Sequence, residues 1–299
     1  MGTDTTDDGG GQGIVTYAIE DKPPLGESIP LGLQHLGAMF LSTVALPLVI
    51  AGAIGLDGGQ TTYVVQMALL VAGVATLVQA YSVGPVGARL PIVMGTSAIF
   101  VAPLISIGTT FGVAAVFGAV IVAAPIEIVI GYFYDDLQRL FPPPVTSIVV
   151  MLVGLTLIPV AIDYAAGGPG AETYGSLTNV GLALLVFAVA VGLNQFFEGF
   201  LSVVSVLVAV VVGYLAAIPL GLLDLSAVAS AGLVSLPRPL AFGVTFEPTA
   251  ILIVAFAYVI TSIETIGDIE GTTGTVDRRP SDDEMEGGLV ADGVMSMFA

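Results

Sequence analysis

Long charge-free runs of hydrophobic residues, separated by short stretches of Gly, Pro and charged residues, make up most of the chain. A hydrocarbon core about 30 Å thick needs about 20 such residues in a helix, and a helix satisfies its own backbone polar groups inside lipid. The pattern therefore predicts an all-α polytopic membrane protein. Eight complete spans are expected, at residues 29–56, 61–81, 90–108, 111–132, 144–162, 177–193, 201–223 and 248–271, and a ninth is expected to open near Gly288.

Two segments depart from the pattern of a plain membrane helix. The third run, LPIVMGTSAIFVAPLISIG at residues 90–108, contains two prolines, a glycine and a Thr–Ser pair. Such a composition is typical of a broken helix, whose freed backbone amides need a polar cavity or a ligand. Residues 224–247 are too interrupted by proline and glycine to span a membrane, and we expect an extracellular loop with a short surface helix there.

Composition and charge narrow the classes of partner. The chain is 56% hydrophobic and 10% charged, and its mean hydropathy is +1.00. It has 24 acidic residues against six Lys and Arg, with a formal net charge of -18. This excess excludes nucleic acid and anionic lipid head groups as partners, because both require basic patches. It favours a surface adapted to high salt, as in a halophile, with an ordinary acidic tail as the alternative.

The few basic residues predict an orientation in the cell membrane. Residues 1–28 are acidic and glycine-rich and lack the basic region and cleavage site of a signal peptide, so we expect a cytoplasmic tail. If the N-terminus is cytoplasmic, five of the six basic residues fall on the cytoplasmic side and only Arg238 falls outside. This distribution follows the positive-inside rule for a multi-pass protein of the plasma membrane.

Two carboxylates interrupt the eighth run, AFAYVITSIETIGDIEGTTG. Glu264 and Asp268 are four residues apart and so share one face of a helix. A carboxylate inside a membrane span is costly and marks a functional site, although an interfacial pair that ends the helix is the alternative. Acids near a helix C-terminus oppose the macrodipole, so another interaction must stabilise them. The N–H edge of a planar heterocycle would suit such an acceptor, and proton coupling and substrate binding could occupy these adjacent groups.

Other polar residues in or beside the hydrophobic runs are weaker candidates. His35, in the first span, must hydrogen-bond across to another helix, either as a strut or as part of a site. Asp292 is a third intramembrane acid candidate, whereas Glu127 and Glu198 border hydrophobic runs and are interpreted as structural or interfacial. The sequence contains no Ser-His-Asp arrangement, HExxH motif, Walker loop or Rossmann fingerprint. We therefore expect no enzyme activity, no metal site and no cofactor beyond a coupling ion.

Four short motifs, in this order, resemble the nucleobase-ascorbate transporters, also called the nucleobase:cation symporter-2 family. They are QH in the first span, GTSAIF in the third, SIETIGDIEGTTG in the eighth and GLVADG at the ninth, and the resemblance extends from about residue 24 to the end. It implies fourteen membrane segments in two inverted repeats of seven. Segments 1–4 and 8–11 would form a core domain, and segments 5–7 and 12–14 a gate.

On that fold the resemblance assigns each part of the chain. Residues 29–143 would hold core segments 1–4, residues 144–223 gate segments 5–7, and residues 248–299 core segment 8 with the start of segment 9. The tenth-segment signature of the family would lie beyond Ala299. We therefore expect the chain to be the N-terminal portion of a transporter.

The resemblance also implies a substrate site between the third and tenth segments. Glu264 would be the substrate-binding carboxylate, and His35 matches the family's first-segment histidine. Ser97, Ala98 and Phe100 would lie on the strand of the third segment beside the base. Many relatives have an aromatic residue where Ala98 stands, which leaves Phe100 as the nearest ring for stacking.

Two acids bear on the choice of substrate. Asp268 matches an aspartate of xanthine and urate carriers, where uracil permeases tend to have histidine, and Asp292 matches the ninth-segment aspartate of purine-transporting members. Both are implied to couple the proton or support the site. The expected function is a secondary active permease for xanthine- or urate-type purines, driven by proton or sodium symport and assembled as a homodimer. The alternatives are a uracil permease of the same family and a truncated, non-transporting membrane protein.

Overall fold

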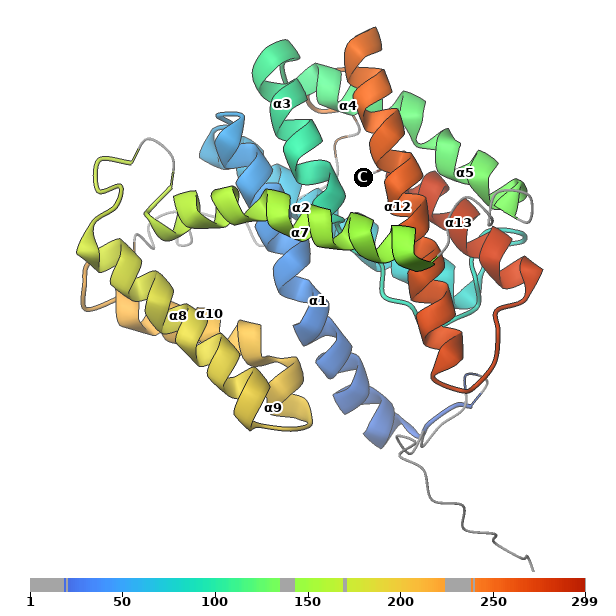
Figure 1. Cartoon of the computed structure of the whole chain (residues 1–299), viewed down its shortest axis with the longest axis horizontal. Helices are drawn as coiled ribbons and strands as arrows, with labels where there is room; N and C mark the ends of the chain where they lie inside the picture. The colour runs from blue at the N-terminus through green and yellow to red at the C-terminus, as the bar shows by residue number, and fades with distance from the viewer. Residues whose placement is uncertain are drawn as a thin grey trace, which may run out of the picture.

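Helices account for the regular structure of the computed structural model, which describes residues 19, 21–134, 143–168, 171–223, 238 and 240–298 (Figure 1). Five helices in these ranges are long and apolar enough to cross a membrane, which confirms the all-α polytopic class. The elements are α1 (Leu25–Ala53), α2 (Gly58–Tyr81), η1 (Ala98–Phe100), α3 (Val101–Phe111), α4 (Val113–Ala123), α5 (Pro125–Tyr132), α7 (Pro143–Ala165), α8 (Leu177–Phe196), α9 (Phe200–Val203), α10 (Ser205–Ala217), α12 (Pro248–Gly274) and α13 (Asp282–Ser296).

The helices gather into two groups (Figure 1). In one group α12 packs against α4, α5 and α13, and α13 packs closely against α5. In the other, α8 packs against α10, with α9 beside them. Helix α1 contacts both groups, touching α2 and α3 on one side and α9 and α10 on the other. The division into core and gate domains stays a prediction.

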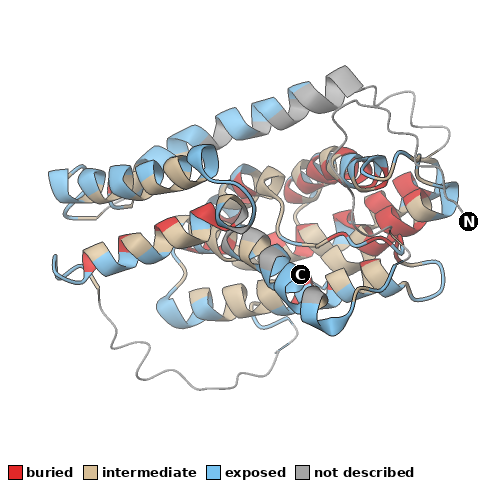
Figure 2. Ribbon diagram, turned by 90° about the horizontal axis from the view of Figure 1, so that it is seen from below, coloured by how far each residue is buried: buried red, intermediate tan, exposed pale blue. Residues whose placement is uncertain are grey.

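Burial is concentrated in the group that contains α12. Figure 2 shows the buried residues gathered in one part of the molecule. Helix α12 contributes many of them, including Val254, Tyr258 and Ile269, whereas no described residue of α8 is buried. Apolar residues that face outward suit a bilayer, where lipid takes the place of a protein core. The buried group is therefore the part of the chain that can enclose a polar site.

The third membrane segment is broken, as its composition predicts. Residues 91–97 form neither helix nor strand, and the short turn η1 then leads into α3. The backbone amide that this break frees at Met94 donates to the hydroxyl oxygen of Thr76 on α2, over 2.9 Å. The hydroxyl of Thr96 donates to the carbonyl oxygen of Ser42 on α1, over 3.1 Å. Residues 91–97 are thus held between α1 and α2, and α3, which follows them, packs against α4 and α12 of the buried group.

Several helix boundaries differ from the predicted spans, as three examples show. The ninth helix begins at Asp282, not near Gly288, because Ser281 and Glu284 form a capping box and acidic side chains suit the first turn. Helix α12 runs on to Gly274, a little beyond the predicted end at about residue 271. The expected seventh span, residues 201–223, is divided into α9 and α10, and the helix ends at Ala217.

Other expectations fall on residues that are not described. Residues 1–18 and 20 of the expected tail belong to this part, and α1 already begins at Leu25. Most of the expected extracellular loop, at residues 224–237 and 239, also lies outside the described residues, as does Arg139.

Glycines bring α13 against its neighbours. A Cβ atom at Gly288 would lie 2.5 Å from Cδ1 of Ile269 on α12. A Cβ atom at Gly293 would lie 3.0 Å from Cβ of Glu127 and 2.9 Å from Cγ1 of Ile128, both on α5. Small residues allow this approach between membrane helices. The consequence is that Asp292, next to Gly293, lies close to both α5 and α12.

Candidate functional site

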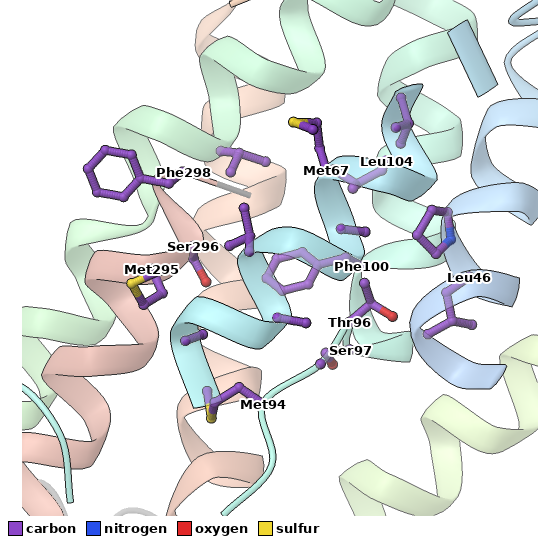
Figure 3. Close-up of a pocket in the computed structure, with 18 of the residues that line it drawn as sticks. Leu46, Met67, Met94, Thr96, Ser97, Phe100, Leu104, Met295, Ser296 and Phe298 are labelled. Carbon is purple, nitrogen blue, oxygen red and sulfur yellow. The ribbon is translucent and has the colours of Figure 1, made fainter. Parts of the chain in front are cut away.

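A cavity of about 680 Å³ opens inside the buried group of helices. Figure 3 shows the broken third segment on its wall, with side chains of α1, α2 and the end of α13 around it. Most of the lining is apolar, as is usual for a small-molecule site. Four acids also line it: Glu127, Glu264, Asp268 and Asp292.

Ser97 fixes the carboxylate of Glu264 at the break in the third segment. The Ser97 hydroxyl donates to Oε2 of Glu264 over 2.6 Å, and Oγ of Ser97 itself accepts from the backbone N–H of Ile99 over 3.3 Å. Ser97 is therefore both the N-cap of η1 and the partner of the carboxylate. Within the described part of the chain, Oε1 of Glu264 accepts no hydrogen bond. The arrangement leaves one carboxylate oxygen available to a ligand.

Two more hydroxyl groups on α12 hold acids of neighbouring helices. Thr265 Oγ1 donates to Oδ2 of Asp292 on α13 over 2.5 Å. Thr261 Oγ1 donates to Oε1 of Glu127 on α5 over 2.6 Å. The spacing of Thr261, Glu264, Thr265 and Asp268 places all four on one face of α12. This face is the polar wall of the cavity.

No basic side chain balances these acids among the residues that the structure describes. The salt bridge found there joins Arg278 to Glu284 over 2.6 Å, at the start of α13. Hydrogen bonds from Arg278 hold the pKa of Glu284 below its ordinary value, with a further contribution from Ser281. The cavity thus has an acidic wall that a cation, a proton or a hydrogen-bond donor can satisfy.

An aromatic ring lies on the same short turn as Ser97, the hydrogen-bond partner of the carboxylate. Phe100 lines the cavity and meets Tyr258 of α12 edge to face, with ring centroids 4.9 Å apart and an interplanar angle of 62°. Because Ser97 and Phe100 belong to the same short turn, the hydrogen-bonding group and the ring are positioned together (Figure 3). Both therefore belong to the wall of the same cavity.

The structure brings together five of the residues singled out from the sequence, but not two others. Glu264, Asp268, Asp292, Ser97 and Phe100 all line the cavity. Ala98 lies in η1 between two of them, yet it is not part of the lining.

His35 also lies away from the cavity lining, as an exposed residue of α1. Its Nδ1 lies 3.0 Å from the carbonyl oxygen of Leu31 in the same helix. Among the described residues, no hydrogen bond from His35 to another helix is found, and its role in the site stays a prediction. The Leu31 carbonyl one turn back thus accounts for one of the two ring nitrogens.

Sequence reasoning missed two polar side chains in the cavity wall. Glu127 is 1% exposed, and Gln79 on α2 is 0% exposed. Among the described residues, Oε2 of Glu127 and both side-chain polar atoms of Gln79 have no hydrogen-bond partner. The signal that singled out Glu264, an acid inside an otherwise charge-free span, was also present at Glu127. Its place at the border of a hydrophobic run favours a structural or interfacial interpretation instead.

Comparison with known proteins gives relatives along almost the whole chain. Residues 26–299 match the model of the family described as "Permease family". The uric acid permease PucK of Bacillus subtilis (strain 168) is 38% identical over 265 residues, which cover 88% of this chain and 62% of the relative. The xanthine permease of the same strain is 34% identical over 270 residues, which cover 90% of this chain and 62% of the relative. The xanthine permease XanP of Escherichia coli (strain K12) is 35% identical over 300 residues, which cover 95% of this chain and 65% of the relative.

These relatives are longer than the present chain, which matches between 62% and 65% of their length. The family and its named members are permeases and not enzymes, in agreement with the sequence analysis. The family match spans far more than half of the chain and includes every motif on which the resemblance rested. The chain therefore belongs to the Permease family, the nucleobase-ascorbate transporters that its motifs resemble.

Proposed function

We propose that this protein is a nucleobase permease that moves xanthine- or urate-type purines across the cell membrane by symport with a proton or a sodium ion. The observation that carries the proposal is the carboxylate of Glu264, held by Ser97 beside the ring of Phe100. An oxopurine presents N–H groups at the edge of a flat ring. The carboxylate can accept from that edge while Phe100 contacts the face of the ring.

The acidic wall supports cation coupling and bears on the choice of purine. Glu264, Asp268 and Asp292 line one cavity, with no basic partner among the described residues. A neutral oxopurine such as xanthine can enter as a hydrogen-bond donor, whereas urate, which is anionic at neutral pH, needs an accompanying positive charge. A symported cation would supply that charge. In this proposal Asp268 and Asp292 couple the proton or support the site.

Several parts of the proposal rest on the resemblance. It assigns His35 and Ala98 to the neighbourhood of the substrate, and it assigns the protein to a homodimer. The cytoplasmic N-terminus and the plasma-membrane location rest on the distribution of the six basic residues. The names of the relatives, which are uric acid and xanthine permeases, support purines over uracil.

Uptake of radiolabelled xanthine into high-salt membrane vesicles tests the proposal. The gene should be expressed as it stands and with any downstream codons, because the relatives are longer. We expect uptake that unlabelled urate suppresses and uracil does not, and that collapses when the driving gradient, proton or sodium, is removed. Suppression by uracil alone would make the protein a uracil permease. No uptake from either form would refute the permease proposal and favour a non-transporting membrane protein.

A further inference from the structure

Glu127 is a buried acid that the proposed substrate site does not use. It lies in the first turn of α5, directly after the junction with α4 at Ala124, and it is 1% exposed. Thr261 donates to its Oε1 over 2.6 Å, and Oε2 has no hydrogen-bond partner among the described residues. A buried charge without a partner is expensive, and one hydroxyl offsets little of that cost. The position suits a carboxyl group that gains and loses a proton.

The groups around Glu127 make its charge matter to the rest of the cavity. From α12 it faces Glu264 and Tyr258, and from α13 it faces Asp292. Helix α4, the other element packed against α5, contains no titratable residue. All the titratable neighbours are therefore acids. A negative charge on Glu127 repels the charges of Glu264 and Asp292, and its neutralisation relieves both.

The cavity connects Glu127 with the proposed nucleobase site. Both Glu127 and Glu264 line it, and Thr261 and Thr265 line the wall between the neighbouring helices. The Thr261 hydroxyl donates to Glu127, and the Thr265 hydroxyl donates to Asp292. A hydroxyl group can both donate and accept a hydrogen bond. The close approach of α13 at Gly293 keeps Asp292 near Glu127. Glu127 and Glu264 therefore share the cavity by which, in this inference, the proton arrives.

We propose that Glu127 is a further proton-binding residue of the transport cycle, separate from the nucleobase-binding Glu264; this inference rests on the proposed function. On loading, a proton from cavity water forms an O–H bond at Oε2 of Glu127, and the side chain becomes neutral. The loss of that charge leaves Glu264 free to stay ionised and accept the N–H groups of the base, so proton and nucleobase bind cooperatively. On release, the O–H bond breaks and the proton returns to water.

The test separates nucleobase binding from proton movement. The full protein, reconstituted in liposomes with an internal pH-sensitive dye, is assayed for exchange of labelled xanthine and for proton flux during net uptake. The variants are Glu127→Gln, Glu127→Asp and, as a matched control outside the cavity, Glu198→Gln, which changes an exposed acid. Glutamine keeps the shape and can still accept from Thr261, but it cannot carry the proton.

We expect Glu127→Gln to bind and exchange xanthine while losing the proton flux that accompanies net uptake. Glu127→Asp should retain that flux, and Glu198→Gln should behave as the unmodified protein. Because Glu127→Gln is buried and could fold poorly, Thr261→Val is a second test that leaves the carboxyl group in place. Loss of the hydrogen bond to Oε1 should displace the pH profile of net uptake, whereas an unchanged profile contradicts the inference.

Four outcomes overturn the inference in distinguishable ways. Normal proton flux in Glu127→Gln refutes the role of this residue and leaves the permease proposal intact. The role of Glu127 is also refuted, with the permease proposal intact, if the unmodified protein transports xanthine with no proton flux, because another ion then drives transport. A folded Glu127→Gln protein that fails to bind xanthine refutes the role in the same way. If the unmodified protein does not bind or exchange xanthine at all, the proposed function fails and the inference falls with it.

Discussion

The hydroxyl of Ser97 has two partners, and its removal tests whether it positions the proposed binding carboxylate. In the structure Ser97 Oγ donates to Glu264 Oε2 over 2.6 Å and caps η1 through the N–H of Ile99. A hydrogen bond to a charged group contributes about 1.5–3 kcal/mol. The carboxylate oxygen faces a cavity and can be rehydrated there, so we take the lower end of that range. Ser97→Ala should therefore weaken xanthine binding about tenfold.

The cap adds an effect on stability that a separate measurement can identify. Loss of an N-cap side chain costs about 1 kcal/mol, so Ser97→Ala should also lower the melting temperature of the purified protein. Ser97→Thr keeps a hydroxyl and should restore most of both properties. Ser202→Ala removes an exposed serine hydroxyl outside the cavity lining and serves as the control.

Equilibrium binding of radiolabelled xanthine to detergent-purified protein gives the affinity directly. The reasoning predicts a dissociation constant about ten times larger for Ser97→Ala and near the unmodified value for Ser97→Thr and Ser202→Ala. Unchanged affinity in Ser97→Ala, together with a lower melting temperature, would show that the serine only caps the helix. That result would refute a positioning role in nucleobase binding.

Two further predictions concern the placement of α13. Gly293→Ala puts a methyl group about 3 Å from α5, so it should destabilise the protein by about 1–3 kcal/mol. The control is Gly181→Ala, where nothing lies within 4 Å of the new atom and no such loss is expected. Equal melting temperatures for the two variants would contradict the packing argument. Because hydrogen bonds from Arg278 hold the pKa of Glu284 below its ordinary value, their contribution to stability is present near neutral pH and is lost as the pH falls through the folded-state pKa. Arg278→Ala should therefore lower the melting temperature near neutral pH and have little effect in acid, and a difference independent of pH would show that the pair does not act in this way.

The features that the sequence predicted well depend only on residues that are close together in the chain. The broken third segment follows from the prolines, the glycine and the Thr–Ser pair in one short run. The pair of acids on α12 follows from a spacing of four residues in an apolar helix. Neither inference needs knowledge of which helices touch.

The features that were missed depend on contacts between segments far apart in the chain. Whether His35 faces the cavity depends on the rotation of α1, which a uniformly apolar helix does not reveal. Glu127 is packed against Gly293 of α13, and its hydrogen-bond partner Thr261 is 134 residues away in sequence. The start of α13 was misplaced because its charged first turn resembles a loop until the capping box is seen.

The most direct test of the central claim is the affinity of purified protein for xanthine before and after Glu264→Gln. The exchange keeps the size of the side chain and the contact with Ser97, but it removes the charge that the N–H edge of the base would meet. The account predicts that binding is lost in a variant that remains folded and inserted. Binding at the unmodified affinity would show that Glu264 is not the carboxylate that recognises the nucleobase.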